Sequence, residues 1–146
     1  MRKLILLGAV TLALVAPAIS QQVDPVKMRE KLMEANGRDA KAGGQMLKGK
    51  APFDAAKAQA IFANMHDVAG KFGNYFPVGS NSPKSEAAPA VWEKPAEFKA
   101  ALAKFEKDTA TAMAAKVTTK EAFGAQFMAV TANCKSCHET FRIKKD

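Results

Sequence analysis

The sequence predicts an all-α protein, an antiparallel four-helix bundle with one long crossover loop. Three observations support this fold class. Apolar residues recur at helical spacing in four separate stretches, no run alternates with a period of two, and alanine is abundant where valine and isoleucine are sparse. Two short connections and one long one join the four stretches, as in bundles whose neighbouring helices run antiparallel.

The first twenty residues are predicted to be an export signal rather than part of the bundle. A positively charged start is followed by an apolar run and then by small residues. The apolar run is too short to span a bilayer comfortably. We expect cleavage after Ser20, with Ala18 as the alternative, so that 1–20 is the signal peptide and 21–146 is the bundle domain, exported to the periplasm.

The net charge of the chain is modestly positive. It is +8 at pH 7, and +6 once Arg2 and Lys3 leave with the signal peptide. The charges are scattered, which favours a solvated surface, although a basic excess can also promote docking to an acidic partner. No basic stripe is interleaved with aromatic residues, so nucleic-acid binding is not expected. The sequence has no second long apolar run, so membrane insertion after signal cleavage is not expected.

The first helix is expected to begin with Asp24 as N-cap and Pro25 at the first helical position. Its apolar stripe consists of Val26, Met33, Ala40 and Leu47. Gly37, Gly43 and Gly44 interrupt this helix, and each costs about 1 kcal/mol relative to alanine. Either a bulky group approaches the backbone there, or the helix ends near Gly43.

The second helix is expected over 54–72, and a long connection over 73–93 follows it. The core face of this helix consists of Ile61, Met65, Val68 and Phe72. A connection of this length is uncommon in a compact domain, so it must either cross from one end of the molecule to the other or cover something. Tyr75, Phe76 and Trp92 would hold it in place.

The third helix is expected from Pro95 to about Lys116, and the fourth opens with a capping box from Thr118 to Glu121. The core face of the third consists of Phe98, Leu102, Phe105 and Ala112. The stripe of the fourth consists of Phe123, Phe127, Val130, Cys134, Cys137 and Phe141. The two cysteines therefore belong to the core face of the last helix.

The segment Cys134-Lys135-Ser136-Cys137-His138 is the C-x-x-C-H pattern of covalent haem c attachment. The two thiols would form thioethers with the porphyrin, and His138 would be an axial iron ligand. On a helix these three side chains share one face. Rival explanations are weaker: zinc needs four ligands, a disulfide here closes almost no loop, and a thioredoxin-like pair opens a helix. One covalent haem c is the predicted cofactor.

The second axial position decides the chemistry, because a strong sixth ligand gives an electron carrier and an open position binds small gases. Met33 lies about 20° from Val26 and from Ala40 around the first helix, on its apolar stripe, whereas Met28 lies about 140° from Met33. Met46 is likewise predicted to turn away from that stripe. Met33 is therefore the candidate ligand, and the alternative is that it lines the pocket without bonding iron.

Two further side chains enter the prediction. Arg29 lies one turn from Met33 on the same face, and an arginine on an apolar stripe needs an anion, for which a haem propionate is the obvious candidate. His66 lies off the stripe of its helix and is expected to be a surface histidine.

The chain resembles the class II c-type cytochromes, the group of cytochromes c-prime and c-556. The resemblance rests on Val26-x-x-Arg29-x-x-x-Met33, Gly49-x-x-Pro52-Phe53-Asp54, Trp92 with Pro95 and Phe98, and Cys134-x-x-Cys137-His138-x-x-Phe141-Arg142. It implies that Arg29 contacts a propionate, that Arg142 packs near the proximal histidine, and that Met33 occupies the distal position. The segment 29–37 is more similar to the low-spin c-556 type, in which that methionine is a ligand. Lys94 departs from the small capping residue of many relatives.

The expected function is electron transfer in the periplasm, by a non-enzymatic protein with His138/Met33 ligation that exchanges electrons with redox partner proteins. A monomer and a homodimer are both compatible with the sequence. The alternative is a five-coordinate, high-spin haem that binds NO or CO. A peroxidase is disfavoured, since it needs a distal acid–base group and His66 is badly phased.

Overall fold

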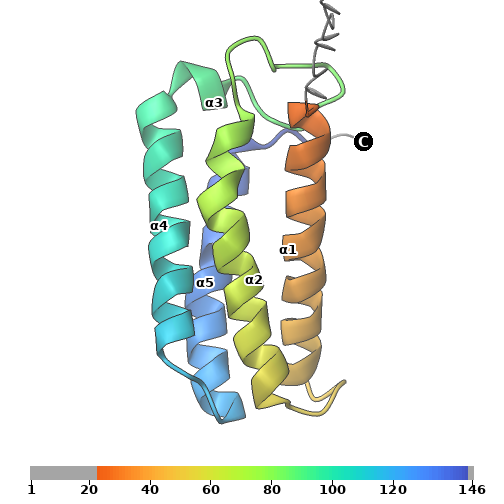
Figure 1. Cartoon of the computed structure of the whole chain (residues 1–146), viewed down its shortest axis with the longest axis vertical. Helices are drawn as coiled ribbons and strands as arrows, with labels where there is room; N and C mark the ends of the chain where they lie inside the picture. Colours follow the sequence, from red (N-terminus) through yellow and green to blue (C-terminus); the bar gives the residue numbers. More distant parts are fainter. Residues whose placement is uncertain (1–22, 145–146) are drawn as a thin grey trace, which may run out of the picture.

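The computed structural model describes residues 23–144, so the predicted signal peptide lies outside the described residues. Its elements are α1 (Pro25–Leu47), α2 (Ala55–Phe72), the 3-10 turn η1 (Gly73–Tyr75), α3 (Ala90–Glu93), α4 (Pro95–Ala114) and α5 (Lys120–Phe141) (Figure 1). Within this range the only extended pairing is an isolated antiparallel bridge between Ala87 and Arg142. None of the helices described is long and apolar enough to cross a membrane.

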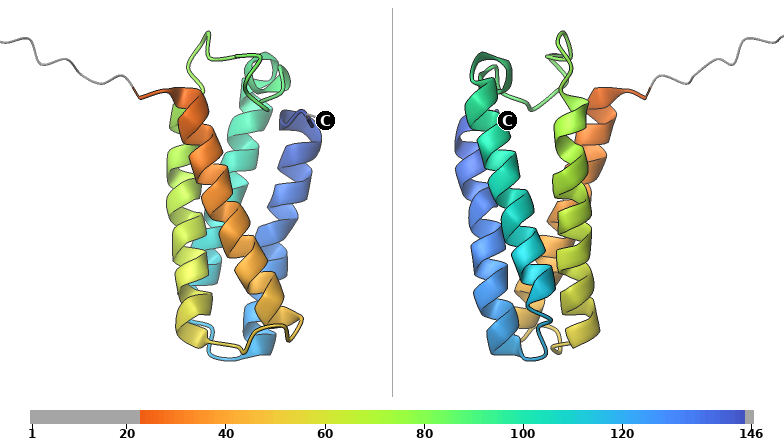
Figure 2. Two further views of the ribbon diagram at one scale, coloured as in Figure 1. Left: turned by 90° about the vertical axis from the view of Figure 1, so that its right-hand side faces the viewer. Right: turned by 60° about the vertical axis from the view of Figure 1, so that its left-hand side comes forward.

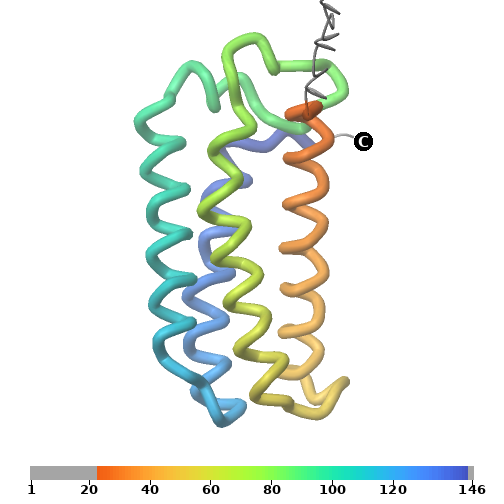
Figure 3. Tube along the Cα trace, viewed as in Figure 1, coloured from red at the N-terminus to blue at the C-terminus, as the bar shows by residue number. Residues whose placement is uncertain are grey.

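The four long helices form the predicted antiparallel bundle, in which each long helix packs against the next in sequence. We call the end where α1 begins and α5 finishes the upper end, as drawn in Figure 1. The connection after α2 stays at this upper end, as the chain trace in Figure 3 shows. The connection therefore does not cross from one end of the molecule to the other. It covers the upper end of the bundle, which was the alternative prediction. There the Ala88 backbone N–H donates to the Phe141 carbonyl at 3.0 Å.

The helix starts are set by side-chain caps. Asp24 accepts hydrogen bonds from two backbone N–H groups of α1, and Asp54 accepts one in α2. The predicted capping box before α5 is wrong in its position. Thr119, not Thr118, is the N-cap and accepts from the Ala122 backbone N–H at 3.2 Å. Glu121 is then the second helical residue, one position too early for the reciprocal bond of a capping box.

The lower half of the bundle holds the larger core. Its buried members are Met46, Ala58, Ile61, Phe62, Met65, Ala112, Val117, Phe123, Phe127 and Val130. The sequence predicts that Met46 turns away from the apolar stripe of α1. The residue is nevertheless buried, with only 4% of it exposed. The reason is that α1 packs against both α2 and α5, so its buried arc is wider than one heptad stripe.

The structure decides between the two explanations for the glycines of α1, which were a helix end near Gly43 and the close approach of a bulky group. The helix continues to Leu47, so it does not end near Gly43. A side chain at Gly43 would collide with the Phe127 ring on α5, whereas nothing lies within 4 Å of the corresponding position at Gly37 or Gly44. Close approach therefore explains Gly43 alone.

A second, smaller cluster lies at the upper end. Its buried members are Val91, Phe98 and Phe141, with Phe72, Phe76, Ala87, Ala90, Trp92, Ala101, Leu102 and Cys137 packed around them. Edge-to-face ring contacts run through it, at 4.8 Å between Phe76 and Phe98 and at 5.2 Å between Phe98 and Phe141. The predicted role of Phe76 and Trp92 in holding the connection is confirmed.

Candidate haem site

The C-x-x-C-H segment lies in the last turns of α5, at the upper end. Cys134, Cys137 and His138 are all half-buried, and both thiols are free of disulfides. Cys137 packs against the upper cluster, which fixes the side of α5 that the segment presents inward. Burial raises the pKa of both thiols, and the neighbouring Cys134 adds to the effect at Cys137.

The surroundings of His138 lower the pKa of its imidazole. Burial lowers its pKa first, the nearby Arg142 guanidinium lowers it further, and Glu86 opposes both. The imidazole is therefore held neutral near pH 7, which is the form that binds a metal.

Arg142 lies near His138, where the resemblance placed it, and it has a partner that sequence reasoning missed. Its Nη2 and Nε lie 2.6 and 2.7 Å from Oε2 of Glu86, with both side chains about half exposed. Glu86 is the only acidic residue over 73–92, and this feature was a signal in the sequence for a partner of a basic side chain. The pair joins the long connection to the end of α5.

The other two side chains predicted for the site, Met33 and Arg29, lie on α1. Met33 is half-buried and Arg29 is buried, and both lie in the upper half of this helix. Helices α1 and α5 come together near the lower end, where Gly43 meets Phe127, and diverge towards the upper end (Figure 2). They are therefore separated over the span in which α1 carries Met33 and α5 carries the C-x-x-C-H segment.

Arg29 has one donor group without a partner. Its Nη2 donates to the Ser80 carbonyl at 2.7 Å, and its Nε donates to the Pro25 carbonyl at 3.2 Å. Its Nη1 is buried and makes no hydrogen bond. Burial lowers the pKa of Arg29, with Asp24 and Glu30 opposing, yet a guanidinium stays charged in proteins. A buried, charged donor without an acceptor is costly, so the site fits an anionic group such as a haem propionate.

His66 lies elsewhere. It is half-buried on α2, and its Nδ1 lies 3.1 Å from the Thr109 hydroxyl on α4. The prediction of a surface histidine is therefore only partly right, because the ring is packed between two helices and hydrogen-bonded there.

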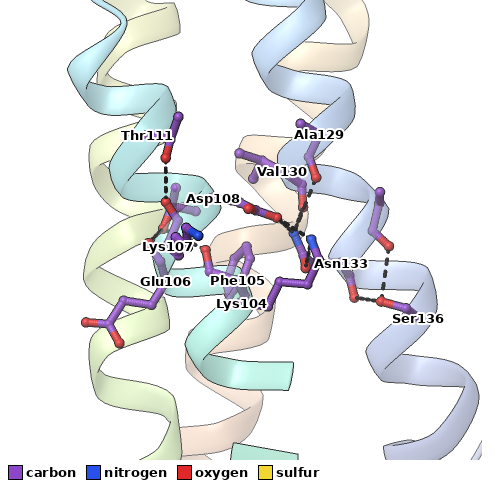
Figure 4. Close-up of polar contacts among 12 residues, drawn as sticks. Lys104, Phe105, Glu106, Lys107, Asp108, Thr111, Ala129, Val130, Asn133 and Ser136 are labelled. Atoms are coloured by element: carbon purple, nitrogen blue, oxygen red, sulfur yellow. Dashed lines mark hydrogen bonds and ion pairs between the residues drawn. The ribbon is translucent and has the colours of Figure 1, made fainter. Parts of the chain in front are cut away.

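Two buried asparagines at the site were missed as functional candidates. Asn36 lies one turn after Met33, and its Oδ1 is buried without a hydrogen-bond partner. Asn133 directly precedes Cys134, and its Nδ2 donates to Asp108 Oδ2 on α4 at 2.7 Å (Figure 4). Hydrophobic periodicity indicates which apolar residues are buried. It does not identify these two asparagines, because they are polar and their hydrogen-bond partners are set by tertiary packing.

The Asn133 amide belongs to a polar clasp between α4 and α5, made of Lys104, Asp108 and Asn133. The Lys104 ammonium lies 2.6 Å from Asp108 Oδ2 and donates to Asn133 Oδ1 at 3.2 Å (Figure 4). Hydrogen bonds from Asn133 and then Lys104 lower the pKa of the Asp108 carboxyl. The clasp fixes the rotation of α5 at the residue before the first cysteine.

A pair of free thiols followed by a histidine near the end of one helix, with a buried arginine that lacks an anion on another, is typical of a c-type cytochrome built on a four-helix bundle. The chain belongs to the cytochrome c' family, whose family model (Cytochrome C') matches residues 24–142. It is thus a haem protein with covalently bound haem c, in a family of electron carriers and gas binders. The Cys134 and Cys137 pair fits that attachment.

The chain is similar to named members of both types. It is 37% identical over 120 residues to cytochrome c-556 of Agrobacterium fabrum, which covers 82% of each chain. It is also 37% identical over 127 residues to a cytochrome c' of Rhodopseudomonas palustris, which covers 85% of each. The solved structure of cytochrome c' from R. palustris superposes with a TM-score of 0.80 at 32% identity, over 86% of this chain and all of that one.

Proposed function

We propose that this protein is a low-spin electron carrier of the periplasm, with His138 and Met33 as the axial ligands of its haem iron. The observation that carries the proposal is the placement of Met33, half-buried on α1 at the same end of the bundle as His138 on α5. The thioether lies one turn from Arg29, whose free Nη1 marks the same part of α1 as a place that needs an anion.

Each side chain has a defined task in this proposal. When bound, the haem supplies a one-electron iron couple. Cys134 and Cys137 hold the group covalently to α5, and His138 offers a neutral nitrogen. Met33 supplies a soft sulfur that favours the reduced state relative to a second imidazole. Arg29 neutralises a propionate. Because α1 and α5 fix the two ligands, little rearrangement accompanies each electron transfer.

Export and partners follow from the same proposal. Residues 1–20 would act as the cleaved signal, and residues 21–146 would form the mature domain, as a monomer or a homodimer. Members of the family that carry electrons interact with redox partners, and c-type relatives are typically periplasmic. The partners proposed here are therefore redox proteins of that compartment.

Visible spectra of the holoprotein test the ligation. We expect the ferrous wild-type protein to be low-spin and insensitive to CO, and Met33→Ala to be high-spin and to bind CO. Met28→Ala is the matched control, since Met28 is another methionine of α1, turned about 140° from Met33. It should keep the wild-type spectrum.

A gas-binding function is the second candidate, because the chain is as identical to a cytochrome c' as to a cytochrome c-556. It requires that Met33 stays off the iron. A high-spin ferrous wild-type spectrum that shifts with CO would establish this alternative and reject Met33 as a ligand.

A further inference from the structure

Arg29 is a buried arginine whose guanidinium contacts three residues of the long connection. We infer that Phe76, Ser80 and Trp92, which we call the Arg29 clamp, aim the free Nη1 at the haem and thereby raise its reduction potential. This inference rests on the proposed function in assuming that Arg29 faces a haem propionate. It adds three positioning residues, none of which needs to contact the haem.

The clamp encloses the guanidinium with rings and a carbonyl. Its central carbon lies 4.7 Å from the Phe76 ring centroid and 5.8 Å from that of Trp92. Such distances allow cation–π attraction, which is stronger in a desolvated setting such as this one. The Ser80 carbonyl accepts from Nη2 at 2.7 Å, which fixes rotation of the planar group about its own axis.

The clamp is itself held in place. The Trp92 indole N–H donates to the Pro77 carbonyl at 3.3 Å, which ties the two ends of the connection together. Phe76 packs edge-to-face on Phe98 of α4 and lies 6.1 Å from the Trp92 ring. These contacts fix the positions of Phe76 and Trp92 beside Arg29.

Only one edge of the guanidinium is then left for a ligand. Nε and Nη2 are engaged with backbone carbonyls, whereas Nη1 is buried and unpaired. An arginine side chain in water samples many rotamers, and ordering it costs conformational entropy when an anion binds. Because the orientation of Arg29 is already fixed, this cost is smaller here. The geometry is that of a donor arranged in advance for a single acceptor.

The consequence for the haem is electrostatic. A propionate carboxylate near the iron stabilises the ferric state, because it is negative, and a fixed cation beside the carboxylate cancels that effect. The attraction between the propionate and Arg29 is strongest where water is excluded. The rings of Phe76 and Trp92 exclude water from one side of Arg29. Loss of the clamp should leave Arg29 charged but less well placed, and the potential should fall.

The test is a double-mutant cycle on the reduction potential of the full-length holoprotein, measured by spectroelectrochemistry. At a fixed electrode potential, Arg29→Gln should lower the ferrous-to-ferric ratio by about tenfold, which is about 59 mV for one electron. Trp92→Leu should lower it by about threefold in the wild-type background and leave it unchanged in the Arg29→Gln background, since Trp92 acts through Arg29.

Two further variants separate positioning from general packing. Trp92→Phe keeps a ring over Arg29 and should retain most of the wild-type potential, and it also serves if Trp92→Leu does not fold. Leu102→Ala removes apolar bulk from the same upper cluster at a residue of α4 outside the clamp. It should leave the potential unchanged.

Any of four results would overturn the inference. The potential could be the same in Trp92→Leu as in the wild type, it could shift equally in both backgrounds, or it could shift as much in Leu102→Ala. Failure of the proposed ligation is seen separately, in the spin state of the unmodified protein, because the cycle compares potentials whichever ligand occupies the sixth position. An unchanged potential in Arg29→Gln would reject the propionate contact itself.

Discussion

At Gly43 the absence of one side chain sets the distance between two helices. A β-carbon there would overlap the Phe127 ring, so Gly43→Ala must push α1 away from α5 or distort the ring. We expect it to lower the free energy of unfolding by about 1–3 kcal/mol, as overpacking does, despite the better helix propensity of alanine. Urea denaturation of the wild type and the variant measures the change.

Gly37→Ala is the control for this prediction. No atom lies within 4 Å of its built β-carbon, so the substitution should stabilise the protein by about 0.5–1 kcal/mol through helix propensity alone. Equal effects at the two glycines would contradict the role assigned to the Phe127 contact.

At this scale the predicted stripe of α1 lies beside the most buried face of the helix, because Val26, Met33, Ala40 and Leu47 are all only half-buried. Helical phasing placed Arg29 in the interior, where only 5% of it is exposed, but it placed Met33 on the apolar stripe, whereas the structure leaves this residue half-buried. It misplaced Met46 because a single stripe was assumed for a helix that has two neighbours. Asn36 could not be assigned a role, since the burial of an amide depends on groups far away in the chain.

The clasp of Lys104, Asp108 and Asn133 couples two elements, and it predicts a pH dependence of stability. The pKa of Asp108 is lowered in the folded state, so its contribution is present above its unfolded pKa of about 3.9 and is lost as the pH falls through the lower folded value. Asp108→Asn should therefore lower the stability at pH 6 and reduce the further loss between pH 5 and pH 3. Urea denaturation at each pH tests this.

Asp67→Asn provides the comparison for the clasp. Its carboxylate pairs with Lys71 on the surface of α2, with both side chains more than half exposed. Because such pairs contribute little, the substitution should hardly alter the pH dependence. A similar response of the two variants would contradict a specific role for the link between α4 and α5.

The helices were predictable as elements, whereas the details of the connections were not. Apolar periodicity gave α1, α2, α4 and α5 because each buries one face over many turns. Helix α3, with four residues, is too short to show a period. Residues 86–88 pair with the end of α5 through backbone groups, as in the 2.7 Å bond from the Ile143 N–H to the Glu86 carbonyl, and these leave no trace in side-chain pattern. The end of α4 two residues before Lys116 follows from that residue's left-handed backbone, with φ of 45°.

Across the whole molecule, the two halves of the bundle are held differently. The lower core draws on all four long helices and includes Met46 of α1. The upper cluster joins the connection to α2, α4 and α5, and it includes no residue of α1. At the upper end α1 meets the connection through the Arg29 clamp, and Leu32 is its buried apolar residue there.

This asymmetry predicts where the haem stabilises the fold. In a haem-free chain with Cys134→Ser and Cys137→Ser, the lower core should stay folded while the upper half of α1 opens locally. Amides over 29–36 should then exchange with solvent at least about tenfold faster than in the holoprotein, whereas those over 58–65 of α2 should change little. Hydrogen exchange with mass spectrometry resolves these segments. A uniform loss of protection would mean that the haem supports the bundle as one cooperative unit, and equal protection with and without haem would place the group away from α1.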